Sequence, residues 1–214
     1  MAMSETRTRA FACPGKYIQG IGEFDLLETY TSAFGPKALF TIDGFLYDGL
    51  NARLEKSYSG TSSSFEAIRF GGECSYAEVD RIIAEAARFG ADVLIGVGGG
   101  KTLDSVKAAA DKSGKPVIIV PTAASCDAPC SAMSVMYTET GEYIHNIRHK
   151  RNPEMVLVDT GIVAKAPTRL FVAGMGDALA TIFEGYANRS SYSPNYVGKG
   201  YRCTGASVAL AELC

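Results

Sequence analysis

Residues 95–107, IGVGGGKTLDSVK, place three consecutive glycines between an apolar run and a segment of helix-forming residues. The run that leads into them, ADVLIGV (91–97), is short and rich in β-branched residues, which is typical of a strand buried on both faces of a parallel sheet. After the glycines, Leu103 and Val106 recur with helical spacing. The stretch therefore predicts a strand, a glycine turn and a helix, in that order.

The glycine turn has two interpretations. A helix N-terminus carries free N–H groups and a partial positive charge, and glycine lets a ligand approach the backbone, so the turn suits a phosphate. The common phosphate motifs do not fit, because a P-loop needs glycine at Ile95 and the motif G-x-G-x-x-G meets Lys101 where its last glycine belongs. A tight turn without a ligand is the other interpretation, and these residues alone do not separate the two.

Composition narrows the class of protein. The chain has 214 residues, of which 47% are hydrophobic, and this is enough for one or two domains with a core. Its net charge is −2, and because acidic and basic residues are interleaved, we expect no nucleic-acid partner. No apolar run approaches the roughly 18 residues of a membrane span, and the N-terminus has no signal-peptide core. We expect a soluble cytoplasmic protein with no membrane partner.

The cysteines are scattered along the chain. Only Cys126 and Cys130 lie close together, and this C-x₃-C pair has no second pair with which to complete a tetrahedral zinc site. In a cytoplasmic protein we expect reduced thiols. The six thiols are Cys13, Cys74, Cys126, Cys130, Cys203 and Cys214.

Strand-like and helix-like segments alternate over most of the chain. Such alternation predicts a parallel sheet with crossover helices, because parallel strands need long connections. Gly90 stands where a helix C-cap is expected. The expected strands are residues 37–43, 64–70, 91–97, 115–121 and 155–160, and the expected helices are residues 46–58, 76–90 and 101–114.

The pattern changes twice toward the C-terminus. Residues 131–145, SAMSVMYTETGEYIH, predict a β-hairpin around TETG. From residue 166 onward the chain is rich in Ala, Gly and Tyr with helical spacing. We expect an α/β domain over residues 1–165 and the start of an all-helical domain over residues 166–214. Because the last helix has no capping signal, we expect it to be cut and to leave apolar faces exposed.

Four blocks in order along the chain resemble a known family. GVGGGKTLDSVKA, VPTAASCDAPCSAMSVMY, NPEMVLVDT and AGMGDALATIFEG resemble glycerol dehydrogenases of the iron-containing alcohol dehydrogenase superfamily. The resemblance implies a Rossmann-like, NAD-binding α/β domain, a helical domain, and a zinc ion in the cleft between them. It also implies a homo-oligomer.

The resemblance assigns roles in cofactor binding. Asp43 corresponds to the position that holds the adenosine ribose, where a carboxylate favours NAD over NADP. The alternative is that Asp43 is a helix N-cap, and the sequence is equally consistent with this role. Gly98, Gly99, Gly100 and Lys101 resemble the pyrophosphate turn. The remaining residues assigned to the cofactor are Thr122, Ser125, Ser131, Met133 and Tyr137.

The resemblance also assigns a substrate residue and a metal ligand. Asp127 corresponds to the position that meets the polyol, and its alternative is an ordinary turn residue. Asp177 resembles the aspartate that ligates zinc, placed at a helix start, where an N-cap is the alternative. The family's other ligands are histidines that correspond to positions beyond Cys214. His145 and His149 follow the predicted hairpin turn, where four strand residues span about 13 Å, so we expect solvated surface histidines.

The implied reaction is the reversible, NAD-dependent and zinc-assisted oxidation of glycerol, or a similar polyol, to dihydroxyacetone. We assign no side chain as general base. One alternative is a nucleotide-binding module without dehydrogenase activity. Another is a related enzyme with a different substrate, such as glycerol-1-phosphate dehydrogenase or dehydroquinate synthase, but the stretch around Asp127 lacks the basic residues that a phosphate would need.

Overall fold

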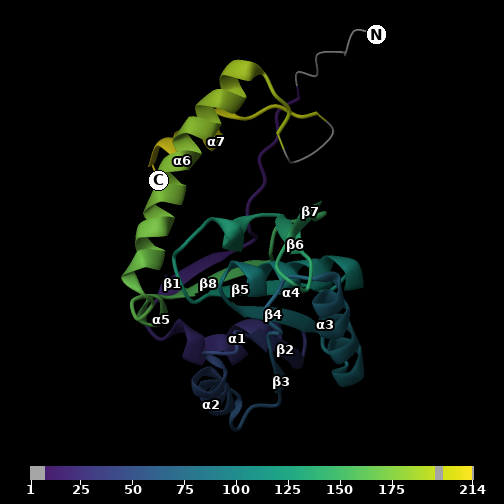
Figure 1. Cartoon of the computed structure of the whole chain (residues 1–214). Coiled ribbons are helices and arrows are strands. Elements are labelled where there is room, and N and C mark those ends of the chain that lie inside the picture. Colours follow the sequence, from purple (N-terminus) through teal and green to yellow (C-terminus); the bar gives the residue numbers. More distant parts are fainter. Residues whose placement is uncertain (1–7, 196–199, 214) are drawn as a thin grey trace.

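The computed structural model describes residues 8–195 and 200–213, and its central feature is one parallel sheet of six strands (Figure 1). The five predicted strands are confirmed, and a sixth, at residues 17–20, was not predicted. All neighbouring strands run parallel. Across the sheet, the order is β1 (Tyr17–Gly20), β8 (Met155–Asp159), β5 (Val117–Pro121), β4 (Val93–Gly98), β2 (Lys37–Ile42) and β3 (Ser64–Arg69).

The central strands are buried on both faces, as their continuous apolar sequences predict. Side chains alternate between two cores, so that Leu94 belongs to one core and its neighbour Ile95 to the other. In β5 the neighbours Ile118 and Ile119 divide in the same way. Two apolar layers therefore sandwich the sheet.

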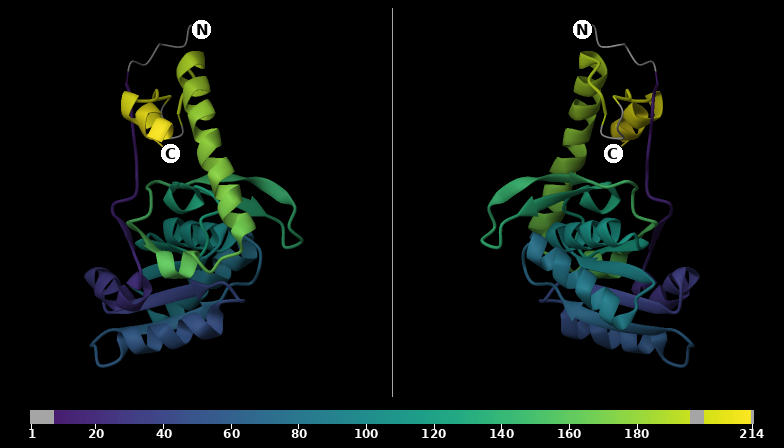
Figure 2. Two further views of the ribbon diagram at one scale, coloured as in Figure 1. Left: turned by 90° about the vertical axis from the view of Figure 1, so that its left-hand side faces the viewer. Right: turned by 90° about the vertical axis from the view of Figure 1, so that its right-hand side faces the viewer.

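Helices cover both faces of the sheet (Figures 1 and 2). On one side, α3 (Tyr76–Phe89) and α4 (Gly100–Ser113) pack on the core that contains Leu94. On the other side, α1 (Leu27–Thr31) and α2 (Tyr47–Tyr58) pack on the core that contains Ile95. Gly90 ends α3 with a φ of 72°, a left-handed conformation that favours glycine, so the predicted C-cap is confirmed.

The predicted hairpin is present. β6 (Met133–Tyr137) and β7 (Tyr143–Arg148) pair in antiparallel fashion and project from the α4 side of the sheet (Figure 2). β6 contacts α4 and is half-buried, whereas most of β7 is exposed. The hairpin is therefore anchored through its first strand.

The C-terminal part is helical. After the short α5 (Thr160–Val163), the long α6 (Thr168–Ser191) leaves the sheet, and α7 (Gly205–Leu213) packs against it (Figure 1). Residues near Ala10 run beside this helical pair, since the N–H of Ala10 donates to the carbonyl of Arg202. The division between residues 165 and 166 stays a prediction.

The long helix α6 has no fully buried side chain. Every fourth residue along one stripe is a large, exposed apolar residue, which agrees with the expectation of exposed helix faces. These residues are Phe171, Met175, Leu179 and Phe183.

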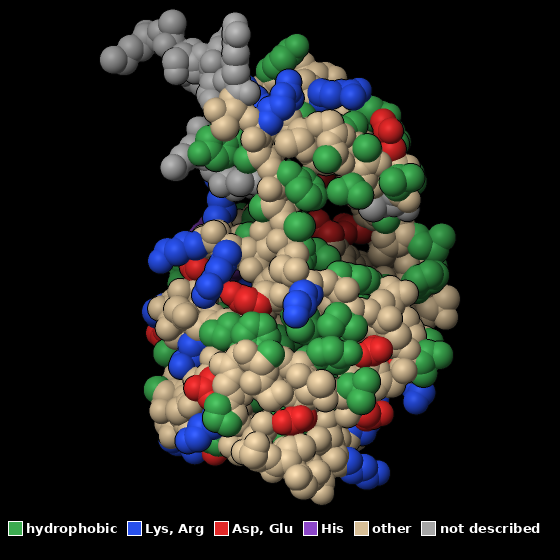
Figure 3. All heavy atoms as spheres, turned by 180° about the vertical axis from the view of Figure 1, so that it is seen from behind, with side chains coloured by type: hydrophobic (Ala, Val, Ile, Leu, Met, Phe, Trp, Pro, Cys, Tyr) green, Lys and Arg blue, Asp and Glu red, His purple; other side chains and the backbone are tan. Residues whose placement is uncertain are grey.

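The surface carries charges of both signs. On the face in Figure 3, lysine and arginine side chains are interspersed with acidic ones, and hydrophobic side chains gather around a hollow between the helical pair and the sheet. Within the described residues, no helix combines the length and apolar character needed to cross a bilayer. The described cysteines form no disulfide with one another, and Cys214 and residues 1–7 lie outside the described residues.

Candidate functional site

The carboxyl ends of three adjacent strands meet at one edge of the sheet. β2, β4 and β5 end there, and the residues that follow them are Asp43, Gly99 and Thr122. The backbone N–H of Asp43 donates to the carbonyl of Val97 at 2.9 Å, and that of Thr122 donates to Gly98 at 3.1 Å. The chain order reverses between β2 and β4, because β3 lies on the far side of β2. Open α/β sheets bind ligands at such a switch point.

A cleft of about 670 Å³ opens at this edge. Its volume is in the range of small-molecule and cofactor sites, about 300–1,000 Å³. Five of the residues predicted to bind the cofactor line it, and they come from three separate parts of the sequence. These five are Asp43, Gly99, Gly100, Thr122 and Ser125.

Asp43 does not cap α2. Its carboxylate oxygen Oδ1 accepts the backbone N–H of Phe45 at 3.0 Å, and its carbonyl accepts the N–H of Leu46. These bonds close a turn ahead of the helix, which begins at Tyr47. The alternative interpretation of Asp43 as the N-cap is therefore wrong, and the carboxylate lies on the wall of the cleft.

The glycine turn is tight on one side and open on the other. A Cβ atom at Gly98 would lie 2.7 Å from the hydroxyl oxygen of Thr102 and 3.1 Å from the Cβ of Asp43, so only glycine fits. A Cβ at Gly99 would meet nothing within 4 Å. Gly99 thus presents bare backbone to the cleft at the start of α4, an arrangement that fits a phosphate group.

Lys101 lies away from this cleft. Its ammonium nitrogen is 2.5 Å from Glu73 Oε1 and 5.2 Å from the centre of the Tyr137 ring. The structure therefore brings two predicted cofactor residues, Lys101 and Tyr137, together with Glu73, but does not place them on the wall that holds Asp43.

Three further predicted residues line a second cavity, of about 810 Å³. Its wall combines the loop after β5 with the end of the hairpin. The predicted residues there are Asp127, Ser131 and Met133. Basic residues from the end of the hairpin line the same cavity, namely Arg148, Lys150 and Arg151. The stretch around Asp127 lacks basic residues, as the sequence analysis states, and the basic residues that share its cavity come from a distant part of the chain.

Lys107 holds the loop between these cavities through hydrogen bonds. This role was not predicted from the sequence. Only 2% of this residue is exposed. Its ammonium donates to the carbonyls of Ala128 at 2.7 Å, Ser131 at 3.3 Å and Met133 at 2.5 Å, and it pairs with Asp104 at 2.9 Å. The available signal was a lysine four residues after Leu103, on the apolar face of a predicted helix.

Asp127 and Asp177 lie next to each other. The backbone N–H of Asp127 donates to Asp177 Oδ2 at 2.8 Å. Partial burial of the carboxyl group and the negative charge of Asp177 raise the pKa of Asp127 above its ordinary value. The structure thus brings together the residues predicted for substrate and metal.

The predicted position of Asp177 at a helix start is wrong. Asp177 lies inside α6, which begins at Thr168, so it is not an N-cap either. Gly174, three residues before Asp177, is explained by helix packing. A Cβ at Gly174 would lie 2.1 Å from the carbonyl oxygen of Ala124, so this glycine permits close packing of the helix on the loop.

Comparison with known proteins shows the family of the chain. The sequence profile described as iron-containing alcohol dehydrogenase matches residues 14–160. The chain belongs to this family. It is 49% identical over 208 residues to the glycerol dehydrogenase of Thermotoga maritima, covering 94% of this chain and 54% of that protein. It is 48% identical to the glycerol dehydrogenase of Escherichia coli, covering 96% of this chain and 56% of that protein.

A solved structure has the same fold as this chain. The crystal structure of a probable glycerol dehydrogenase from Sinorhizobium meliloti matches with a TM-score of 0.90 and 46% identity, covering 97% of this chain and 56% of that one. The chain therefore spans about half the length of the relatives it matches.

The described residues do not by themselves form the metal centre that the family name implies. No group of three or more His, Cys, Asp or Glu side chains within residues 8–195 and 200–213 is placed to hold a metal. Catalytic zinc takes three protein ligands. Asp177 is one candidate carboxylate, and the zinc expected from the sequence stays a prediction.

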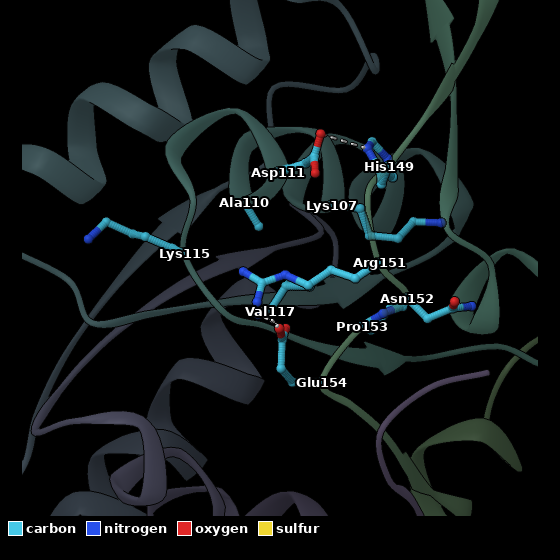
Figure 4. A pocket seen from close by; sticks show the side chains of 10 residues that line it. All are labelled: Lys107, Ala110, Asp111, Lys115, Val117, His149, Arg151, Asn152, Pro153 and Glu154. Atoms are coloured by element: carbon cyan, nitrogen blue, oxygen red, sulfur yellow. Dashed lines mark hydrogen bonds and ion pairs between the residues drawn. The ribbon is translucent and has the colours of Figure 1, made fainter. Parts of the chain in front are cut away.

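The two histidines differ in environment. His145 is exposed on β7, as predicted, and its ring lies 2.9 Å from the hydroxyl of Tyr76. His149 is not a solvated surface residue, because only 4% of its side chain is exposed. It faces a small pocket of about 20 Å³ beside Asp111 of α4 (Figure 4). The alternation of a hairpin strand could not reveal that its end folds against α4.

Hydrogen bonds determine the tautomer of His149. The hydroxyl of Ser134 donates to the carbonyl of Asp104, so its oxygen accepts from His149 Nε2 at 2.7 Å. In the neutral ring, Nδ1 then carries no proton and faces Asp111 Oδ2 at 3.7 Å (Figure 4). Burial lowers the pKa of His149, with Lys107 acting in the same direction and Asp111 and Asp104 opposing it.

This environment predicts a pH-dependent stability. The unfolded chain binds a proton at His149 near pH 6.5, whereas the folded chain binds it only at lower pH. The free energy of unfolding should therefore fall as pH drops below about 6.5, and this contribution should stop falling below the folded-state pKa. The chain has two histidines, so NMR titration of His145→Gln isolates the His149 resonance. Asp111→Asn should lower the pKa further, and a midpoint at or above 6.5 in the parent protein would contradict the assignment.

Proposed function

We propose that the chain forms the NAD-binding part of an enzyme that oxidises glycerol, or a similar polyol, to dihydroxyacetone by hydride transfer. One observation carries the proposal. The carboxylate of Asp43, the bare turn at Gly99 and the hydroxyl-bearing loop after β5 converge on one cleft at the switch point of the sheet. The glycerol dehydrogenases at 48–49% identity support the substrate class.

The residues in this cleft suit the adenosine half of NAD. In the proposal, Asp43 accepts hydrogen bonds from the ribose hydroxyls, and its charge repels the 2′-phosphate of NADP. The backbone at Gly99 and Gly100 approaches the pyrophosphate at the start of α4. The hydroxyls of Thr122 and Ser125, which line the same cleft, add further donors.

The loop held by Lys107 suits the nicotinamide half. We assign Ser131, Met133 and Tyr137 to that end of the cofactor, and Asp127 to the polyol. Lys101, which the resemblance places in the pyrophosphate turn, lies beside Tyr137, so we reassign it to the nicotinamide end. Bound NAD would accept the hydride from the carbinol carbon, and the hydroxyl proton would pass to solvent. The protein residues would orient the two reactants, because the redox chemistry belongs to the cofactor. Asp177 is proposed as one metal ligand, and a bound zinc would polarise the alcohol oxygen as a Lewis acid.

Isothermal titration calorimetry on the 214-residue chain tests the proposal. We expect NADH to bind with higher affinity than NADPH, and the preference to be largest at low salt, where charge repulsion is least screened. A chain that is folded by circular dichroism and binds neither nucleotide would contradict the proposal. Binding without oxidation of glycerol would identify this chain as a nucleotide-binding module, which is the alternative raised from the sequence.

A phosphorylated polyol is the second candidate substrate. The observation in its favour is that Arg148, Lys150 and Arg151 line the same cavity as Asp127. Arg151 already pairs with Glu154 at 3.2 Å, which reduces the positive charge available to a ligand. We therefore favour the neutral polyol. A cytoplasmic location and self-association stay predictions from the sequence.

A further inference from the structure

Phe45 is the most exposed of the large apolar side chains in the described part of the chain. Its exposed fraction is 95%, although it lies within the α/β domain and two residues after Asp43. A single exposed apolar residue is ordinary on a protein surface. Phe45 differs because it lines the cleft at the switch point of the sheet.

The position of Phe45 relative to Asp43 is determined by the backbone. The N–H of Phe45 donates to Asp43 Oδ1 at 3.0 Å, and the next N–H, that of Leu46, donates to the Asp43 carbonyl at 3.0 Å. The turn therefore holds the aromatic residue beside the carboxylate. A ligand that reaches Asp43 also reaches the neighbourhood of Phe45.

The lining of the cleft is partly polar and partly apolar. Gly99, Gly100, Thr122 and Ser125 supply backbone and hydroxyl groups, and charged residues line the cleft as well. The larger apolar residues come from the turn before α2 and its first part, and from α5, the link after it and the start of α6. They are Phe45, Leu46, Leu50, Ile162, Pro167 and Leu170.

We propose that Phe45 is the stacking platform for the adenine ring of the cofactor. This inference rests on the proposed function, because it assumes that Asp43 holds the adenosine ribose. In the proposed complex, Asp43 accepts hydrogen bonds from the hydroxyls of the adenosine ribose. Adenine is bonded directly to that ribose, so only the sugar ring separates the base from the carboxylate. The turn places Phe45 and Leu46, two of the apolar lining residues, beside Asp43. An apolar surface can cover a flat, weakly polar base, and the ring of Phe45 supplies a flat surface there.

ADP-ribose is a suitable probe, because it contains the adenine, ribose and pyrophosphate but no nicotinamide. Stacking of a base on an aromatic side chain contributes to affinity, so Phe45→Ala should weaken ADP-ribose binding by on the order of tenfold. Phe45→Tyr should bind as the parent protein does, because it keeps the ring. Phe183→Ala is the matched control, since Phe183 is exposed on α6 and does not line the cleft.

Calorimetry supplies the affinities, and NMR supplies a readout that a merely structural role would not change. In the parent complex, the adenine H2 and H8 resonances should shift upfield under the ring current of Phe45, and the shift should be lost in Phe45→Ala. Equal affinity and equal shifts in the parent and Phe45→Ala proteins would overturn the platform while leaving the proposed function intact. Failure of the folded parent protein to bind ADP-ribose would overturn both.

Discussion

Lys107→Met is expected to lower the free energy of unfolding by about 3–5 kcal/mol, the range for breaking a buried ion pair by removing one partner. Methionine has nearly the length of lysine, so the main loss is electrostatic. Without the ammonium, the buried carboxylate of Asp104 keeps no counter-charge at 2.9 Å. The carbonyls of Ala128, Ser131 and Met133 also lose the ammonium as a donor, although the Ser131 hydroxyl remains within hydrogen-bond distance of the first and the third. Any buried acceptor left without a partner adds to the cost.

Urea unfolding at pH 7 measures this effect, and Lys112→Met is the matched control. Lys112 is on the same helix and pairs with Asp80, but both side chains are more than half exposed. Exposed pairs contribute about 0–1 kcal/mol, so the control should unfold close to the parent protein. Similar small shifts for both variants would show that the Lys107 network does not stabilise the loop.

Asp43→Ala is expected to weaken NADH binding by at least about 100-fold, because two hydrogen bonds from the ribose to a charged acceptor are lost, each worth about 1.5–3 kcal/mol. The same change removes the charge that opposes a 2′-phosphate, so NADPH should lose much less affinity, and the preference for NADH should shrink. The NADH affinity of Asp43→Asn should fall between those of the parent protein and Asp43→Ala, since an amide oxygen can still accept the N–H of Phe45.

Fluorescence titration of NADH and NADPH measures this pair of affinities. Asp48→Asn is the matched control, because Asp48 is an exposed acid on α2 that pairs with Arg69 and does not line the cleft. If Asp43→Ala keeps the cofactor preference of the parent protein, Asp43 has no role at the ribose. If Asp48→Asn changes the preference equally, the effect is a general one of surface charge.

The central strands were predictable because a strand buried on both faces requires a continuous apolar run, and each run is visible in the sequence. The edge strand β1 was not predicted, because it lacks such an apolar run. It has four residues, alternates between exposed and half-buried positions, and ends at Gly20. Helices α2, α3 and α4 were predictable from their spacing and, for α3, from the C-cap at Gly90.

The errors at the site have a common physical origin. Asp177 was expected at a helix start, but α6 begins at Thr168, and Gly174 is required where α6 passes Ala124, a contact 50 residues away in the sequence. His149 and Lys107 are polar residues with buried side chains. They can be buried because they find polar partners on other elements. Local spacing reports which residues share a face, and it does not report what that face meets.

By itself, the sequence determined the kind of elements, the parallel α/β class and the family resemblance, since these depend on local periodicity and on contiguous motifs. Only the tertiary structure decided that Asp43, Gly99 and Thr122 line one cleft, that Lys101 and Tyr137 lie together outside it, and that basic residues line the same cavity as Asp127. The reason is that strand order across the sheet, and the pairing of buried charges, arise from contacts between distant segments. The packing free energy of the whole chain selects those contacts.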